Sequence, residues 1–185
     1  MGLRGRSRFA AAGHVLFVTT TAANFAHVFS CGSTYYNILI ESLEFVLNEH
    51  QAVLFAYVLM PNHVHLVLRL PEGQSISDLM RDFKKYTSTK IRQELEKNRR
   101  VTYLSVLRRN AMGRKAQVFK LWMDRFDDVV IEDDETQATI VDYVHCNPVK
   151  AGLVEKAEEW IYSSAADYLM IRKGPLGVCT NWYCA

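Results

Sequence analysis

The chain has 185 residues, of which 49% are hydrophobic and 23% are charged. This is the usage of ordinary globular domains with a hydrophobic core, and it excludes a disordered, collagen-like or low-complexity chain. The 22 basic and 20 acidic residues give a formal net charge of +2, which by itself indicates no class of partner. We expect one domain over residues 1–185.

Signals for a membrane or an oxidising compartment are weak. No apolar run reaches the roughly 18 residues of a membrane helix. The stretch after the basic start of the chain is interrupted by Gly13 and His14 and is rich in β-branched residues, so we expect a strand there and not a signal peptide. The four cysteines show no CxxC spacing. We therefore predict reduced thiols, a cytoplasmic location and no contact with a membrane.

Basic and acidic residues are segregated along the chain. Residues 81–125 contain fourteen Lys and Arg against four Asp and Glu, a local charge of +10. Residues 127–159 contain ten acidic residues against two lysines, a local charge of −8. Because phosphate binding depends on local potential, this pattern indicates a surface for a polyanion such as a nucleic acid. The alternative is a solvated helix face whose charges are compensated elsewhere.

The first half of the chain predicts a strand, a helix and a hairpin. Loose alternation and β-branched residues favour a strand over 14–21, and helically spaced apolar residues favour a helix over 33–50. An apolar run at 52–60, a Pro-Asn turn and a second run at 63–70 together predict a β-hairpin.

The third quarter of the chain is basic. Residues 75–97 predict a helix with Ser75 or Ser77 at its N-cap. Residues 98–117 are basic and without clear periodicity, so we expect an insertion or a mobile loop there. Residues 118–131 have the composition of a strand.

The last quarter predicts helices and an irregular tail. A helix begins at Asp134 and ends at Asn147, because Pro148 disfavours the helical conformation of the residue before it. A short helix follows over 157–170, and 171–185 form an irregular tail. The order strand, helix, strand, strand, helix, strand is that of a ferredoxin-like α+β sandwich, in which helices pack on an antiparallel sheet.

Two histidines lie two residues apart in the predicted strand 63–70. Successive side chains of a strand face opposite ways, so His63 and His65 share one face about 7 Å apart. Two imidazoles at this spacing can bind one metal ion. The pair follows a turn and precedes apolar residues, which places it at the rim of the sheet. The alternative is a pair of hydrogen-bonded or surface histidines without a metal.

Tyr143 and Asn147 lie on the same face of the helix predicted after Asp134, because residues four apart project together. Tyr143 lies off the stripe of Val141 and Val144 that we expect to face the core, so packing alone does not explain it. The alternative is a half-buried tyrosine without a chemical role. Cys146 lies roughly 100° away around the helix, and we do not count it as a ligand.

The segments MPNHVHLVL (60–68) and DYVHCNPVKAGLV (142–154), in this order, resemble the REP-associated tyrosine transposases, single-tyrosine members of the HUH endonuclease superfamily. The resemblance runs from about His14 to Tyr168 and includes WxxRF at 122–126. It implies the HUH endonuclease fold. It also implies that His63 and His65 act in catalysis as the metal-binding pair, with Tyr143 as nucleophile and Asn147 as third metal ligand.

The resemblance further implies an activity at DNA hairpins. The tyrosine hydroxyl attacks a phosphodiester of single-stranded DNA and leaves a 5′-phosphotyrosine link and a free 3′-hydroxyl; strand transfer reverses the step. A phenol with an ordinary pKa near ~10 is a poor nucleophile at neutral pH, so it needs help. Two imidazoles and an amide oxygen suit Mg²⁺ or Mn²⁺, which can polarise the phosphate. No nucleotide cofactor is expected, because the covalent link retains the bond energy.

We expect DNA contacts from basic side chains in three places, namely the start of the chain, the helix 75–97 and WxxRF: Arg4, Arg6, Arg8, Lys84, Lys85, Lys90 and Arg125. Tyr86 falls on the apolar side of its helix, so we assign it to the core.

Two other functions stay open: a domesticated, catalytically silent hairpin-DNA-binding protein of the same fold, and a metal-dependent hydrolase of a small molecule. Both a monomer and a homodimer that exchanges its tyrosine helices are compatible with the sequence.

Overall fold

The computed structural model describes residues 13–113 and 118–181. Its elements in chain order are β1 (Val15–Thr21), η1 (Ala23–Phe25), η2 (Phe29–Cys31), α1 (Ser33–Glu49), β2 (Val53–Leu59), β3 (His63–Arg69), α2 (Ile76–Lys97), α3 (Val101–Arg109), β4 (Asp127–Ile131), α4 (Asp134–Lys150), η3 (Ala157–Glu159) and α5 (Ala165–Tyr168), where η marks a 3₁₀ helix. Within these two ranges, no helix is long and apolar enough to cross a membrane.

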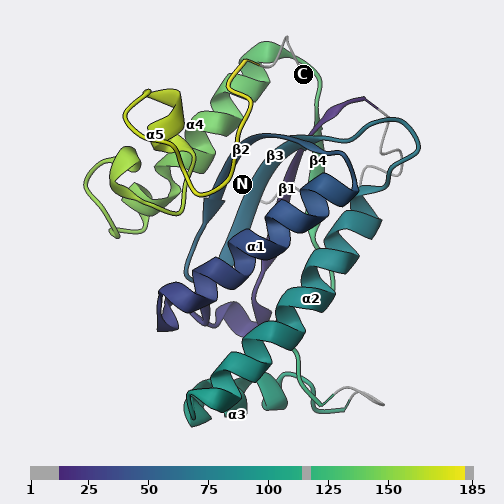
Figure 1. Ribbon diagram of the computed structural model, residues 1–185, viewed down its shortest axis with the longest axis vertical. Helices are drawn as coiled ribbons and strands as arrows, with labels where there is room; N and C mark the ends of the chain where they lie inside the picture. Colours follow the sequence, from purple (N-terminus) through teal and green to yellow (C-terminus); the bar gives the residue numbers. More distant parts are fainter. Residues whose placement is uncertain (1–12, 114–117, 182–185) are drawn as a thin grey trace.

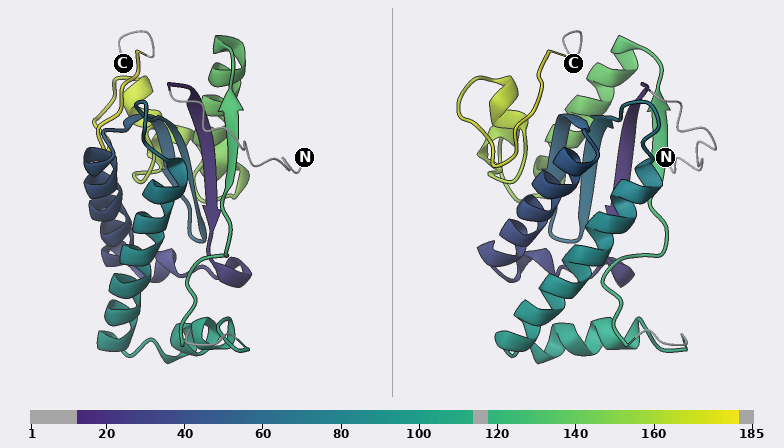
Figure 2. Two further views of the ribbon diagram at one scale, coloured as in Figure 1. Left: turned by 90° about the vertical axis from the view of Figure 1, so that its right-hand side faces the viewer. Right: turned by 45° about the vertical axis from the view of Figure 1, so that its right-hand side comes forward.

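The four strands form one sheet in the order β2-β3-β1-β4, and each neighbouring pair is antiparallel. Helices α1 and α2 lie on one face of the sheet and α4 lies on the other (Figures 1 and 2). The predicted ferredoxin-like α+β sandwich is therefore confirmed.

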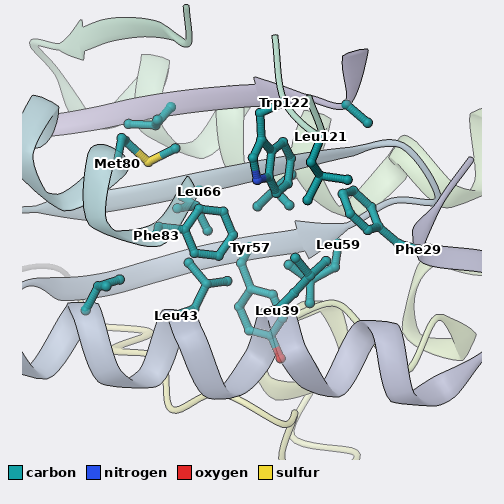
Figure 3. Close-up of a cluster of buried hydrophobic side chains, with 14 of the residues drawn as sticks. Phe29, Leu39, Leu43, Tyr57, Leu59, Leu66, Met80, Phe83, Leu121 and Trp122 are labelled. Carbon is teal, nitrogen blue, oxygen red and sulfur yellow. The ribbon is translucent and has the colours of Figure 1, made fainter. Parts of the chain in front are cut away.

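The larger hydrophobic core fills the space between the sheet and helices α1 and α2. Leu43 of α1, Leu66 of β3 and Phe83 of α2 are fully buried there. Figure 3 shows these side chains in one cluster with Trp122, which comes from the segment before β4 and whose ring lies beside that of Phe83. The apolar stripes of both helices meet the even-numbered residues of β3, because strand side chains alternate between faces.

A smaller apolar cluster lies on the opposite face of the sheet, under α4. Phe17 of β1 and Val67 of β3 pack there against Val141 and Val144 of α4. The predicted core stripe of this helix is thus confirmed. His63 and His65 share the face of Val67, because all three are odd-numbered residues of one strand.

The basic segment 98–117 is partly helical. Of the two alternatives expected there, the mobile loop is wrong for α3, where Leu104 and Leu107 are buried and lie three residues apart on one side of a short helix. Two pairs of arginines around this short apolar stripe obscured its periodicity. Residues 114–117 lie outside the described part of the chain.

The segment 118–131 is a strand only at its end, in β4. The preceding residues have strand composition because Leu121 and Trp122 are buried in the core. Their main chain lies beside the end of β1 and the residue after it. Ala22 and Trp122 form an isolated β-bridge, and Met123 N–H donates to the Thr21 carbonyl (2.8 Å). These residues are buried as strand residues would be, but they do not form a continuous ladder of main-chain hydrogen bonds, so the strand is shorter than predicted.

Helix α4 continues through Pro148 to Lys150, so the prediction that it ends at Asn147 is wrong. The helix is capped by Asp133, whose carboxylate accepts from Thr136 N–H (2.7 Å). A proline close to the end of a helix removes one N–H bond, and the turn beyond it is still closed by Ala151 N–H donating to the Asn147 carbonyl (3.0 Å).

The single helix predicted over 157–170 is also wrong, because the chain is interrupted between η3 and α5. Ser163 forms a bridge with Val58 of β2, and this pairing requires extended backbone. The segment 171–181 is irregular as predicted but packs on the domain: Leu176 is buried and Cys179 N–H donates to the Leu54 carbonyl (2.8 Å). These contacts cover the edge of β2.

Candidate active site

His63 and His65 lie at the start of β3, on the face of the sheet that α4 covers. In the antiparallel register, His63 is opposite Thr21 and His65 is opposite Thr19. The two imidazole ring centroids are 4.7 Å apart. His65 is only 5% exposed.

Each imidazole is bonded through Nδ1 to a neighbouring oxygen. His65 Nδ1 lies 2.8 Å from Thr19 Oγ1, and His63 Nδ1 lies 2.7 Å from Asn62 Oδ1. The amide oxygen can only accept, and a hydroxyl can accept, so the Nδ1–H tautomer satisfies both bonds and leaves the Nε2 lone pairs available. Metal-binding histidines are commonly oriented in this way.

Burial keeps both imidazoles neutral. Burial and, to a smaller extent, the nearby His63 together lower the pKa of His65 to about 3. Burial also lowers the pKa of His63, although a hydrogen bond with the Asn147 side chain acts in the opposite direction. Neutral imidazoles are the form that binds metal ions.

Tyr143 is brought to the histidines by α4. Its ring centroid is 5.6 Å from that of His65 and 6.0 Å from that of Phe17, in both cases edge to face. The side chain is 42% exposed, so a phosphodiester in solvent can reach it. Both α4 and β3 belong to one chain, and the arrangement is therefore complete without a second copy.

Asn147 lies one helical turn after Tyr143 and joins the same group. Its Nδ2 donates to the Tyr143 carbonyl (2.9 Å), and its side chain also bonds His63. An amide nitrogen has no lone pair to offer a hard cation, so Oδ1 is the atom of this side chain that could bind one. The four residues predicted for the site thus lie together.

The donor set fits a divalent cation with open positions. It consists of two Nε2 lone pairs and one amide oxygen, without a thiolate. Within 13–113 and 118–181, no three His, Cys, Asp or Glu side chains come together to hold a metal. The acidic third ligand that a small-molecule hydrolase would use is therefore not found in these ranges.

Several residues of the site were missed by sequence reasoning. Thr19 and Phe17 come from β1 and carry no motif, and Asn62 was assigned only to the turn. Lys150 lies beyond the predicted end of its helix, and its Nζ is 5.1 Å from the centroid of the Tyr143 ring. Only Asn62 had a local signal, because it directly precedes His63.

Lys84 does not face solvent as a phosphate contact would. Its Nζ donates to the carbonyl of Met123 (2.6 Å) and lies near those of Asp124 and Arg125 (3.4 and 3.3 Å). Burial lowers the pKa of Lys84 to about 8. The ammonium joins α2 to the segment before β4, so we remove Lys84 from the candidate DNA contacts.

The other candidate DNA contacts are spread over the molecule. Lys85 and Lys90 are exposed on α2, across the sheet from the histidines, and Arg125 is exposed before β4. Tyr86 is 44% exposed with Lys90 Nζ 5.6 Å from its ring centroid, so its assignment to the core is wrong. Three further candidates lie outside the described residues: Arg4, Arg6 and Arg8.

Comparisons with known proteins show which family the chain resembles. The family model described as "Transposase IS200 like" matches residues 14–147, a range that contains all four site residues. A Haemophilus influenzae protein assigned as a REP-associated tyrosine transposase is 33% identical over 114 residues, covering 59% of this chain and 56% of the relative. The REP-associated tyrosine transposase of Escherichia coli is 26% identical over 133 residues, covering 71% and 66%. The matches thus span between about half and two thirds of these relatives' lengths.

A solved structure shares the fold. It is a REP-associated tyrosine transposase bound to a REP hairpin, with a TM-score of 0.67, 22% identity, and coverage of 97% of this chain and 94% of that one. At this identity the match supports the fold alone. The predicted resemblance is confirmed, and because the family model covers most of its length, the chain belongs to the IS200-like transposase family.

Proposed function

We propose that this protein is a metal-dependent single-strand DNA endonuclease and strand transferase that forms a 5′-phosphotyrosine intermediate at DNA hairpins. One observation carries the proposal: Tyr143 and Asn147 of α4 meet the neutral His63 and His65 of β3 within one chain. The hairpin bound by the structural neighbour supports the choice of DNA as partner. A DNA substrate also agrees with a cytoplasmic location.

Tyr143 is the proposed nucleophile. Its hydroxyl oxygen attacks the phosphorus of a phosphodiester, the bond from phosphorus to the 3′ oxygen breaks, and the proton lost by the phenol is balanced by the one gained by the leaving 3′-hydroxyl. Phe17 and His65 contact the ring on its edges and restrict its orientation. A ring whose orientation is already restricted loses less entropy when its hydroxyl attacks.

His63, His65 and Asn147 are the residues that would hold Mg²⁺ or Mn²⁺. When bound, the ion supplies Lewis-acid polarisation of the phosphate. Thr19 and Asn62 keep the two rings in the tautomer and direction that metal binding requires.

The test is covalent capture of DNA. A hairpin oligonucleotide with single-stranded flanks is incubated with the protein and Mg²⁺ or Mn²⁺, and a denaturing gel detects a protein–DNA adduct. We expect an adduct with the wild type, none with Tyr143→Phe, and none when a chelator is present. Equal adduct yields from the wild type and Tyr143→Phe would show that Tyr143 is not the nucleophile.

The second candidate is a catalytically silent hairpin-binding protein of the same fold. It is favoured by the structural neighbour, which is bound to a hairpin, because hairpin binding does not require cleavage. Such a protein binds hairpins with steep salt dependence and forms no adduct with any divalent ion.

A further inference from the structure

The loop between β1 and α1 exposes an aromatic ring beside the candidate active site. Phe25 is 64% exposed, and it and Asn24 both adopt left-handed backbone conformations, with φ of 53° and 55°. Non-glycine residues rarely adopt this conformation, and it persists only where the surroundings hold it.

Hydrogen bonds fix this loop to the residues next to His63. Phe25 N–H donates to the Ala22 carbonyl (3.0 Å), and the Phe25 carbonyl accepts from Asn62 Nδ2 (3.2 Å). The other side-chain atom of Asn62, Oδ1, is the partner of His63 Nδ1. One side chain therefore connects the exposed phenylalanine to a proposed metal ligand.

The end of α3 is attached to the same loop. The Asn24 amide donates to Asn110 Oδ1, and Asn110 Nδ2 donates to the Ala23 carbonyl (3.3 Å). Directly before Asn110, Arg108 and Arg109 end the helix with exposed side chains. Neither guanidinium has an ion-pair partner in the part of the chain that the structure describes. Two exposed cations, without an ion-pair partner among the described residues, thus end the helix that is bonded to the Phe25 loop.

We propose that Phe25, Arg108 and Arg109 form a docking surface for single-stranded DNA next to the cleaved phosphodiester. An unpaired base stacks on the phenyl ring, and the guanidinium groups bind the phosphates on either side of it. Aromatic rings combined with cations are the usual means of binding single strands, whereas a base inside a duplex has no free face for Phe25. The choice of DNA as ligand rests on the proposed function.

The stacking test uses a matched aromatic control. Binding is measured in the Tyr143→Phe background, so that no DNA is consumed, with a short oligothymidylate that carries one 2-aminopurine. We expect Phe25→Ala to weaken binding about tenfold and to relieve the quenching of 2-aminopurine fluorescence, and Phe25→Trp to retain both signals. Phe45→Ala is the control, because Phe45 is 62% exposed on α1, across the sheet from the site. Equal effects of Phe25→Ala and Phe45→Ala would overturn the proposal.

The electrostatic test uses the salt dependence of the same binding reaction. Arg108→Gln/Arg109→Gln is expected to reduce the slope of log affinity against log salt by about 1.4, since each cation on a single strand contributes about 0.7. The control Lys156→Gln/Lys173→Gln removes the same charge from exposed positions after α4 and leaves the slope unchanged. A slope that falls equally in both double variants would contradict a local site.

Failure of this surface is distinguishable from failure of the proposed function. Single-strand binding is measured in the Tyr143→Phe background and adduct formation with Tyr143 intact, so the two readouts are independent of each other. If the wild type forms no adduct while Phe25→Ala still loses single-strand binding, the proposed function fails and the docking surface stands. If Phe25→Ala binds single strands like the parent protein, the docking surface is wrong whatever the adduct yield.

Discussion

The two faces of the sheet are formed by alternate residues of the same strands, but they bury different chemistry. On β3, Leu66 and its even-numbered neighbours enter the large core under α1 and α2, while His63 and His65 face α4. A neutral imidazole in an apolar environment costs free energy unless it is hydrogen-bonded. The large core under α1 and α2 therefore supplies most of the apolar burial that stabilises the fold, so the face under α4 can carry a polar site.

Helix α4 is attached to its face by two kinds of contact. Val141 and Val144 pack in the smaller apolar cluster, and His145 is buried with its Nε2 2.8 Å from Ser164 Oγ. Tyr143 lies on the exposed side between these contacts. The helix thus holds the proposed nucleophile firmly while presenting it to solvent.

Two neighbouring residues of β3 give the largest expected contrast. Leu66→Ala removes a fully buried side chain from the large core, and we expect the free energy of unfolding to fall by about 3 kcal/mol. The folded fraction should still form the DNA adduct at the wild-type rate. His65→Ala should change the free energy of unfolding by no more than about 1 kcal/mol and slow adduct formation about 100-fold or more.

Urea unfolding and the rate of adduct formation, measured on both variants, check this contrast. Val64→Ala is a control on the same face as Leu66, and it should resemble Leu66→Ala in kind with a smaller loss of stability. If His65→Ala loses as much stability as Leu66→Ala, the division between the two faces is wrong.

The spacing of residues within single elements was sufficient to predict the strands and helices that make up most of the fold. Alternation in HVHLVLR placed both histidines on one face of β3, and i to i+4 spacing placed Tyr143 and Asn147 together on α4. The order of strands and helices then permitted one common sandwich topology. The motifs of the resemblance joined the two pairs, which spacing alone could not do.

The remaining features depend on contacts between distant segments. Thr19 reaches His65 only through the register of β1 and β3, and no local signal encodes that pairing. The segment around Trp122 resembles a strand in composition because Trp122 is buried in the core, where its Nε1–H donates to Thr87 Oγ1 (2.9 Å). The left-handed conformation of Phe25 is fixed by Asn62, which lies far away in sequence. Tertiary bonds of this kind override propensity.

A pH experiment tests the attachment of α4 at His145. Burial lowers the pKa of His145 to about 4, against an opposing effect of Asp142. The unfolded chain takes up a proton near pH 6.5 and the folded chain does not until pH 4. The stability from a neutral His145 is therefore complete above pH 6.5 and is lost as the pH falls toward 4. This loss amounts to roughly 3 kcal/mol.

Urea unfolding of the wild type and His145→Gln at pH 7 and near pH 4 measures this contribution. Other groups titrate in the same range, so the expected result is the difference: the wild type should lose roughly 3 kcal/mol more than the variant. An identical pH dependence of the two proteins would mean that His145 is not a buried neutral group. His50→Gln is a control, because His50 lies at the end of α1 on the other face of the sheet.

The smallest expected effect concerns the exposed rim of the α4 face. Lys150 Nζ lies 5.1 Å from the centroid of the Tyr143 ring, where an ammonium attracts the phosphate and the negative charge that moves through the phenol oxygen during attack. Lys150→Met keeps most of the alkyl chain and removes the charge, so adduct formation at saturating DNA should slow about tenfold, equivalent to about 1.4 kcal/mol.

Two control variants accompany this test: Lys150→Arg should retain most of the rate, and Lys173→Met should match the wild type. Because Lys150 is exposed, its loss should leave the free energy of unfolding within about 0.5 kcal/mol. A rate unchanged in Lys150→Met would limit the chemistry of this face to the four residues His63, His65, Tyr143 and Asn147.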